Sequence, residues 1–432
     1  MELGLKTFII CLMLLSPLMA SGIETNVETT IEKTVQNEWI LIYRTDAPID
    51  MLAFKSSPDK SRTFRWRPLD DSFVVTVLDN KEIIRKSDST KFTQVSLYLT
   101  PTYIPLPKDY APFSPFYDGS MLIHSGRFFA CPNTCTGYHN SWEITLISND
   151  TDLIIVDGKS FKGRSSWVDK DEGQKVYVGS ALPIENENIF AFIDNKLPSV
   201  LFKVLQLQIP EMMVYFSEKL GKLKFKPTLF ASYSDDNSGS YGNQGGTLPN
   251  QVFMHWYGKK AIADLNEFQV SWFFAHEIAH VFQGEAKNIS AIEQQWIHEG
   301  GAEYMAYELL SSLGGKYRNY AKEKFSTDTK NCHKNTSEQS FGALIQQKKY
   351  DALYECGLVF WKIIATDELA LENKVSIFDI WTNFNLQVDD GNSATFDTFI
   401  NTLKPFVTEN TYNTIHEFLE YRATENKHSS KE

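Results

Sequence analysis

Five consecutive residues, His276-Glu277-Ile278-Ala279-His280, have the clearest chemical potential in this sequence. Two histidines four positions apart on a helix emerge from one face about one turn apart, so both imidazoles can bind a single zinc ion through nitrogen. Glu277 is rotated to the flank of that face, where it is badly placed to bind the metal but close enough to take a proton from an attacking water. The pentapeptide therefore predicts a Zn2+ site with Glu277 as general base.

Two helices are expected to position this group. Residues 268–283 have the pattern of a buried helix that is closed by Gly284. The next helix is expected to open with a capping box at residues 290–293 and to continue through residues 296–304. Eighteen residues separate His280 from Glu299 in that second helix.

This spacing resembles that of a known group of enzymes. His-Glu-x-x-His, then eighteen residues, then Glu within Trp-x-x-Glu-Gly-x-x-x-Tyr is similar to the gluzincin metallopeptidases, above all the aminopeptidase N and leukotriene hydrolase family, with the glycyl aminopeptidases as a neighbouring possibility. The resemblance implies that Glu299 is the third ligand of one zinc ion, beside His276 and His280. It also implies that Glu303, one turn further on, accepts a hydrogen bond from a ligand imidazole; a solvated surface glutamate is the alternative.

A second match lies downstream, at Tyr354-Glu355-Cys356-Gly357. It resembles the Tyr-Glu-Lys-Gly of the family, whose tyrosine stabilises the tetrahedral oxyanion. A phenol can donate a hydrogen bond to developing negative charge without occupying the metal. Tyr354 is therefore the candidate oxyanion donor, with a plain packing role as the alternative, and Cys356 departs from the pattern by replacing lysine.

One departure concerns substrate binding. Aminopeptidases of this family carry Gly-x-Met-Glu-Asn upstream of the zinc helix, and its glutamate binds the free α-amine of the substrate. The corresponding stretch here, near residues 242–246, has no glutamate, and no acidic residue occurs from Asn237 to Ala263. The strand after this stretch could still bind an extended peptide at a sheet edge. His298 replaces a usual asparagine and is interpreted as structural, with a role in the pocket as the alternative.

The remaining sequence predicts an α+β protein in which a β-rich domain precedes the catalytic one. Residues 23–197 are expected to form the all-β domain, because runs such as residues 94–99 and 142–146 alternate polar and apolar side chains. Residues 198–422 are expected to form a thermolysin-like, mainly helical zinc domain, followed by a polar tail at 423–432.

The first part of the catalytic region predicts alternating helix and strand. A helix is expected over residues 198–221 with a kink at Pro210, then a strand over residues 225–233. A glycine-rich loop at residues 238–246 is expected to precede a second strand over residues 251–257.

The N-terminus is typical of an export signal. Residues 7–20 form an apolar run followed by small residues, which predicts a signal peptide over residues 1–22; an uncleaved anchor is the alternative. No other stretch is long and apolar enough to cross a bilayer, so no membrane span is expected after cleavage. The layout fits a secreted or periplasmic protein.

Four cysteines remain after the signal. An even number in an exported chain suggests disulfides, and we predict the pairs Cys131–Cys135 and Cys332–Cys356. The short spacing of the first pair would also suit a structural zinc, but no second pair completes a four-ligand site.

The charge of the chain argues against one class of partner. The net charge is −12 and Lys and Arg are not densely clustered, so nucleic acid is not an expected partner. The sequence thus indicates a secreted zinc-dependent peptidase, either an endopeptidase or an aminopeptidase, that acts on peptides or proteins. A zinc hydrolase of a non-peptide bond and a non-catalytic secreted binding protein on the same scaffold are the alternatives; the oligomeric state stays open.

Overall fold

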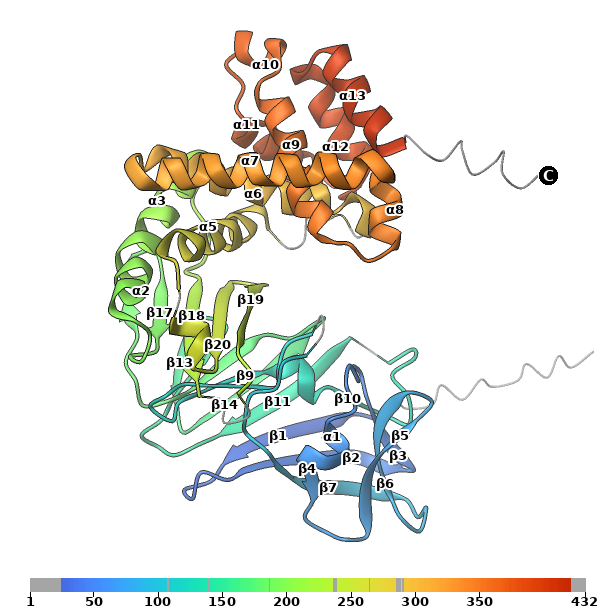
Figure 1. Ribbon diagram of the computed structural model, residues 1–432. Helices are drawn as coiled ribbons and strands as arrows, with labels where there is room; N and C mark the ends of the chain where they lie inside the picture. Colours follow the sequence, from blue (N-terminus) through green and yellow to red (C-terminus); the bar gives the residue numbers. More distant parts are fainter. Residues whose placement is uncertain are drawn as a thin grey trace, which may run out of the picture.

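The computed structural model describes residues 25–420, apart from 107–108, 139, 186, 236–238, 264, 285–288 and 290. The predicted signal peptide, the polar tail and Ser290 of the predicted capping box lie outside these residues. The described chain is an α+β protein, in which a region of β-sheets is followed by a mainly helical region (Figure 1). This arrangement confirms the predicted fold class.

Three sheets build the N-terminal region. The first has the order β14-β11-β1-β2-β7-β4, the second β10-β3-β6-β5 and the third β13-β12-β15-β9-β8. The strands of the first sheet are β1 (Val27–Lys33), β2 (Trp39–Ile49), β4 (Trp66–Pro68), β7 (Phe92–Leu99), β11 (Ser141–Ile147) and β14 (Arg164–Lys170). Those of the second are β3 (Met51–Phe54), β5 (Phe73–Leu78), β6 (Lys81–Lys86) and β10 (Ala130–Pro132). Those of the third are β8 (Phe113–Pro115), β9 (Met121–His124), β12 (Leu153–Val156), β13 (Lys159–Lys162) and β15 (Lys175–Gly179).

Alternating side chains explain why these strands form. In β1 every second residue is buried, and Ile31, Leu41 and Leu97 from three adjacent strands are fully inaccessible. The two strands predicted from this alternation are confirmed as parts of β7 and β11. One short helix, α1 (Arg62–Arg65), and one 3-10 turn (Ser125–Phe128) interrupt the sheets.

A fourth sheet supports the helices and has the order β16-β17-β18-β20-β19. Its strands are β16 (Ile184–Glu185), β17 (Phe190–Ile193), β18 (Thr228–Ser234), β19 (Gly242–Leu248) and β20 (Gln251–Tyr257). The three central strands β17, β18 and β20 run parallel, whereas β19 pairs antiparallel with β20 and forms one edge. The sheet takes strands from both sides of residue 198, and a domain boundary there stays a proposal.

Edge strand β19 corrects one expectation. Residues 238–246 were expected to form a loop because glycine usually weakens a strand, yet residues 242–248 pair along β20. A Cβ atom on Gly245 would lie 2.6 Å from the Phe273 ring and 2.7 Å from the Phe253 carbonyl oxygen. Glycine at this position therefore lets the strand lie directly against the neighbouring helix.

The predicted kinked helix is present as three pieces: α2 (Ser199–Lys203), a π-helical turn (Val204–Gln208) and α3 (Ile209–Leu220). The wide turn ends where Pro210 enters α3, as expected when proline removes a backbone donor.

The helix that carries His276 and His280 is α5 (Glu267–Gln283), which follows the short α4 (Lys259–Ala263). Its predicted end is confirmed: Gly284 has a φ of 81° and its N–H donates to the His280 carbonyl. The next helix, α6 (Trp296–Ser312), begins later than predicted, because residues 292–294 form a 3-10 turn before it.

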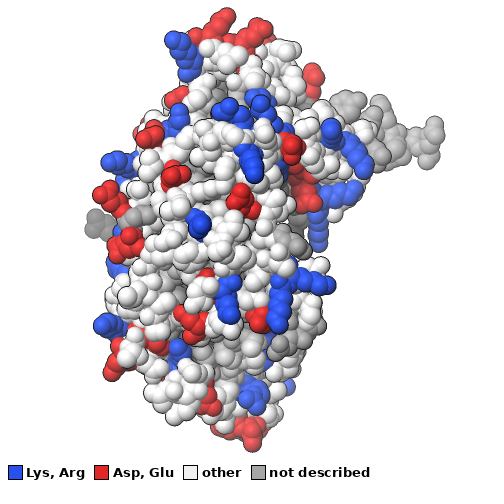
Figure 2. Space-filling model, turned by 60° about the vertical axis from the view of Figure 1, so that its left-hand side comes forward, with Lys and Arg blue, Asp and Glu red and all other residues white. Residues whose placement is uncertain are grey.

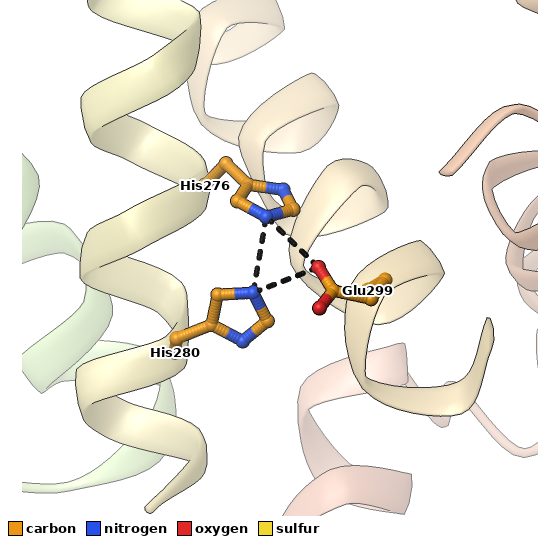
Figure 3. Close-up of side chains that lie close together, drawn as sticks. All are labelled: His276, His280 and Glu299. Carbon is orange, nitrogen blue, oxygen red and sulfur yellow. Dashed lines mark hydrogen bonds and ion pairs between the residues drawn. The ribbon is translucent and has the colours of Figure 1, made fainter. Parts of the chain in front are cut away.

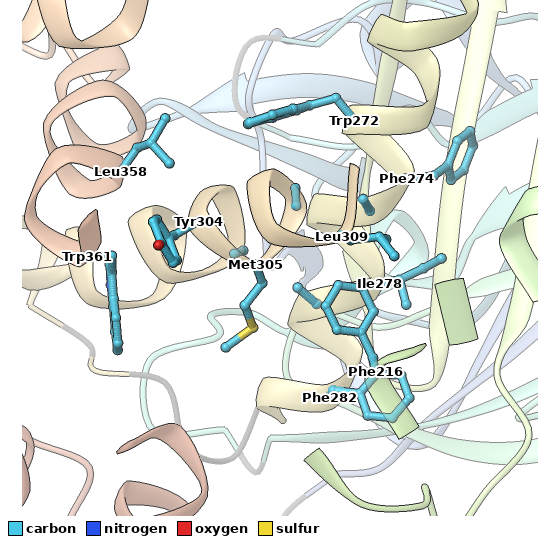
Figure 4. Packing of buried hydrophobic residues seen from close by; sticks show 14 of the residues in the cluster. Phe216, Trp272, Phe274, Ile278, Phe282, Tyr304, Met305, Leu309, Leu358 and Trp361 are labelled. Atoms are coloured by element: carbon cyan, nitrogen blue, oxygen red, sulfur yellow. The ribbon is translucent and has the colours of Figure 1, made fainter. Parts of the chain in front are cut away.

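Seven further helices complete the described part of the chain, and the prediction of a largely helical C-terminal region is confirmed. They are α7 (Gly315–Glu338), α8 (Phe341–Gln346), α9 (Asp351–Ala365), α10 (Glu368–Glu372), α11 (Ile377–Asp389), α12 (Phe396–Leu403) and α13 (Glu409–Glu420), with a 3-10 turn at Lys404–Phe406. Figure 4 shows the apolar packing that holds α5, α6 and α9 together, with Phe274, Met305 and Trp361 completely buried.

Both predicted disulfides are confirmed. Cys131 is bonded to Cys135, and Cys332 on α7 is bonded to Cys356 on α9. Within the described part of the chain, no helix combines the length and hydropathy needed to cross a membrane. On the face drawn in Figure 2, basic and acidic side chains are interspersed, so this face presents no extended field of one sign.

Candidate metal centre

Helices α5 and α6 bring His276, His280 and Glu299 together (Figure 3). The two Nε2 atoms of the histidines are 3.0 Å apart. Glu299 Oε2 lies 3.2 Å from His280 Nε2 and 3.3 Å from His276 Nε2. Three donor atoms from residues up to 23 positions apart thus meet at one point, as the resemblance implied for the ligand set.

The spacing of these atoms fits a zinc ion. In a tetrahedral zinc site with bonds of about 2.0–2.1 Å, neighbouring ligand atoms lie about 3.3 Å apart. The observed separations of 3.0, 3.2 and 3.3 Å are close to that value. Two neutral imidazoles and one carboxylate also match the donor chemistry that zinc prefers, and three protein ligands leave a fourth position for water or substrate.

A hydrogen bond on the far side of the His280 ring selects the nitrogen that faces the centre. His280 Nδ1 lies 2.6 Å from Gln283 Oε1, which can only accept, so Nδ1 carries the proton and Nε2 is left free. Gln283 is held in this orientation because its Nε2 donates to the His298 carbonyl at 3.1 Å. On the other ring, His276 Nδ1 lies 3.4 Å from Glu303 Oε1.

Glu303 is a buried carboxylate with several neighbours, not the solvated surface residue of the alternative interpretation. Only 7% of the residue is exposed. Trp272 Nε1 donates to its Oε2 at 2.6 Å, and Lys324 Nζ lies 3.6 Å from the same oxygen. Lys324 also pairs with Asp328 at 2.7 Å, so α7 carries a charged pair that supports Glu303 behind the metal centre.

Glu277 lies on the flank of the ligand face. It is 9% exposed and lines the same cavity as the three donor residues. Thr247 on β19 donates its hydroxyl hydrogen bond toward Glu277, with Oγ1 2.7 Å from Oε2 and 2.9 Å from the main-chain oxygen. The edge strand therefore contacts the candidate general base directly.

Tyr354 on α9 completes the group of predicted residues. Its ring centroid is 5.7 Å from that of His276. Burial, and then the carboxylates of Glu299, Glu277 and Glu303, raise the pKa of Tyr354 above its ordinary value, so the phenol keeps its proton and remains a donor.

The helices that carry Glu299 and Tyr354 touch through their backbones. A Cβ atom on Gly300 would lie 2.3 Å from the Gly357 Cα, which leaves no room for any side chain. Cys356, which replaces the lysine of the family pattern, forms the disulfide to α7. Two features of the short stretch after Tyr354, a glycine and a cystine, therefore fix α9 against its neighbours.

These residues line a cavity of about 1270 Å³ between β19 and helices α5, α6, α7 and α9. The described acidic residues that line it are Glu277, Glu299 and Glu303, and the described basic one is Lys324. No acidic side chain comes from β19, in keeping with its sequence.

His298 is part of the cavity wall, and its ring accepts a hydrogen bond from the backbone. Its Nε2 accepts a hydrogen bond from the Ile289 N–H at 3.1 Å, and its ring packs edge-on against Trp381. Burial lowers the pKa of His298 to about 3, so the ring is neutral. Among the other described histidines, His255 is buried between the hydroxyls of Ser232 and Ser234, at 2.8 and 3.0 Å, and His124 is 2% exposed. His139 and His428 lie outside the described residues.

Sequence reasoning missed Gln283, Thr247 and the pair of Trp272 and Lys324. Gln283 lies three residues after His280, so helical spacing could have indicated it. The others act over about 20 to 30 residues of the chain, and no local pattern signals them.

Comparison with known proteins adds evidence on the fold. No protein-family model matches the chain, and no curated protein does either. An M1 zinc metallopeptidase from Deinococcus radiodurans, crystallised as a glutamate-to-alanine variant with a Tyr-Ser-Ala substrate, matches with a TM-score of 0.51 and 10% identity over 92% of this chain and 95% of that chain. A second structure of M1 zinc metallopeptidase from that organism matches with a TM-score of 0.50, at 10% identity over 92% and 94% of the two chains.

Yeast LTA4 hydrolase in complex with bestatin also aligns, with a TM-score of 0.42 and 11% identity over 94% of this chain and 66% of that chain. The two Deinococcus matches cover nearly the whole of both chains. The described chain therefore has the fold of the M1 zinc metallopeptidases, with a His-His-Glu group as its candidate metal site.

Proposed function

We propose that this chain is a secreted zinc-dependent peptidase. The observation that carries the proposal is the convergence of two imidazoles and one carboxylate at 3.0–3.3 Å, with a further carboxylate and a phenol on the same cavity. A metallopeptidase fold that spans 92% of the chain supports the same conclusion. One of the matched enzymes was crystallised with a tripeptide substrate, which supports a peptide as the substrate class.

His276, His280 and Glu299 hold the metal in this proposal. When bound, zinc supplies Lewis acidity toward water and the substrate carbonyl. Glu277 takes a proton from the attacking water and later delivers it to the leaving amine, for which its position beside the ligand face is suited. Tyr354 donates a hydrogen bond to the oxyanion, since its raised pKa keeps the phenol protonated at neutral pH. Glu303 and Gln283 fix the two ligand rings.

The substrate is proposed to lie along β19 as an added strand. Among the described strands, β19 forms the edge of its sheet beside α5, and extended peptides commonly bind to such edges through main-chain hydrogen bonds. The strand offers no carboxylate to a free α-amine. The acidic residues that line the described cavity already face the metal centre, Thr247 or Trp272. We therefore propose cleavage that does not require a free N-terminus.

Export is part of the proposal. The N-terminal apolar run is typical of a signal peptide, and two disulfides suit an oxidising compartment. N-terminal sequencing of the protein recovered outside the producing cells is expected to begin near residue 23.

The decisive experiment combines metal analysis with cleavage of a mixed peptide library. We expect about one zinc per chain and cleavage that stops with a chelator and returns with added zinc. Zinc without cleavage of any peptide would favour a hydrolase of another bond, which an ester and epoxide panel would detect. A chain that binds zinc and hydrolyses nothing would be the non-catalytic scaffold.

A further inference from the structure

Edge strand β19 contributes a hydroxyl to the candidate general base. Thr247 Oγ1 lies 2.7 Å from Glu277 Oε2 and 2.9 Å from the Glu277 main-chain oxygen. A threonine hydroxyl has one proton, so it donates to one of the two oxygens at a time while staying within reach of both. Both acceptors belong to the same residue, so the contact fixes the side chain relative to its own backbone.

The contact depends on how closely the strand approaches the helix. Gly245, two residues earlier on the same face of β19, leaves space for Phe273 of α5, where a Cβ atom would lie 2.6 Å from the ring. The residue before Gly245 also anchors the strand, because Gln244 Nε2 donates to the Asp109 carbonyl at 2.9 Å. Two anchored residues on the N-terminal side of Thr247 thus keep this part of β19 in place beside α5.

The contact with Thr247 leaves one oxygen of the Glu277 carboxylate available for proton transfer. Glu277 lines the cavity, and with Oε2 engaged by Thr247 its Oε1 keeps its lone pairs for a proton. A free glutamate side chain samples several rotamers, and a charge-assisted hydrogen bond to one oxygen removes most of that freedom. A base that is misplaced by about 1 Å can lose about a hundredfold in rate.

We propose that Thr247 is a positioning residue that holds the Glu277 carboxylate in its working orientation, so that the strand proposed to bind the substrate also orients the base. The inference rests on the proposed peptidase function. It adds a role to a residue on the stretch that lacks the amine-binding glutamate.

The test compares Thr247→Val, which keeps the branched shape and removes the hydroxyl, with Thr247→Ser, which keeps the hydroxyl. We expect Thr247→Val to lower kcat about 10- to 100-fold with KM and zinc content within about threefold of wild type. Thr247→Ser should retain kcat within about fivefold, because the donor is present. Thr228→Val serves as the matched control. The Thr228 hydroxyl is buried on β18 and has no hydrogen-bond partner among the described residues, so its loss should leave kcat unchanged.

A second readout does not depend on turnover. In crystals of the zinc-loaded proteins, Glu277 should adopt one conformer in wild type and Thr247→Ser, and several conformers or a displaced carboxylate in Thr247→Val. A single unchanged conformer in Thr247→Val would overturn the proposal, as would a kcat equal to wild type or a loss confined to KM. If the wild type cleaves no peptide, the proposed function fails, and the conformers of Glu277 still decide the role of Thr247.

Discussion

The cavity has two walls of opposite character. The helical wall, from α5, α6 and α9, carries the charged and ionisable groups His276, His280, Glu277, Glu299 and Tyr354. The strand wall, β19, has no charged residue from Gly242 to Leu248 and presents glycines, small polar side chains and main-chain groups. Thr247 is the point at which the two walls are joined by a hydrogen bond.

The difference between the walls suggests that the chemistry and the orientation of the substrate depend on separate parts of the cavity. In the proposed mechanism, the groups on the helical wall determine the chemistry, because they would hold the metal, the base and the oxyanion donor. The strand wall is proposed to orient the substrate, and an uncharged strand edge suits any extended backbone. Changes on the helical wall are therefore expected to alter turnover, and changes in the substrate's N-terminus to have little effect.

The largest effect is expected from Glu277→Gln. The amide keeps the shape of the side chain and cannot accept the proton of water, so kcat should fall by about 10³- to 10⁴-fold. Zinc content measured by atomic emission should stay at wild-type level, because Glu277 is not one of the three donors. Glu267→Gln, on the first turn of the same helix, is the matched control. Activity near that of the control would remove Glu277 from the mechanism.

Tyr354→Phe should have the next largest effect. Loss of one oxyanion donor typically costs about 10²- to 10³-fold in kcat, and the zinc content should not change. Steady-state kinetics on one peptide would measure the loss. Tyr307→Phe removes a hydroxyl from α6 outside the cavity lining and should be close to wild type. Similar kcat values for the two variants would assign Tyr354 a packing role only.

Gly300→Ala tests the close backbone contact between α6 and α9 within the helical wall. The new Cβ atom would collide with backbone atoms of Gly357 at 2.3 and 2.4 Å, so we expect a loss of about 1–3 kcal/mol or more in the free energy of unfolding. Gly342→Ala on α8 meets nothing within 4 Å and should be neutral or up to about 1 kcal/mol more stable. Chemical denaturation of both variants would measure the contrast, and equal stabilities would contradict the close contact.

The smallest effect is expected from blocking the substrate's N-terminus. Acetylated and free forms of one peptide should differ by less than about threefold in kcat/KM, since β19 has no carboxylate to bind the amine. A hydrogen-bonded ion pair to the amine is worth about 1.5–3 kcal/mol, or more than tenfold. A preference above about tenfold for the free peptide would therefore reveal an anionic group that binds the amine. It would contradict the description of the substrate-binding wall as uncharged.

The helical wall was predictable because its signals are local. The apolar run of α5, its terminal Gly284 and the four-residue spacing of the histidines all lie within one helix. The strand wall was not predictable from local patterns: glycines suggested a loop, whereas the pairing of β19 depends on β20 and on Phe273. The start of α6 was also misplaced, since a 3-10 turn and the neutral His298 organise that entry through tertiary contacts.

The contacts around the ligands show the same division. Gln283 follows its partner by three residues on a helix, and Glu303 follows Glu299 by one turn. Thr247 and Trp272 reach their partners across about 30 residues of chain, so their roles depended on the packed structure.

The disulfide between Cys332 and Cys356 determines what happens when the backbone is cut between the two cysteines. The two cysteines lie 24 positions apart, and the segment that they close holds α8 and the adjoining ends of α7 and α9. A single cut of the backbone anywhere inside that segment leaves both pieces covalently joined, with Tyr354 still attached to α7 through its own helix. The cystine thus keeps the part of the chain that carries the proposed oxyanion donor in one covalent piece after such a cut.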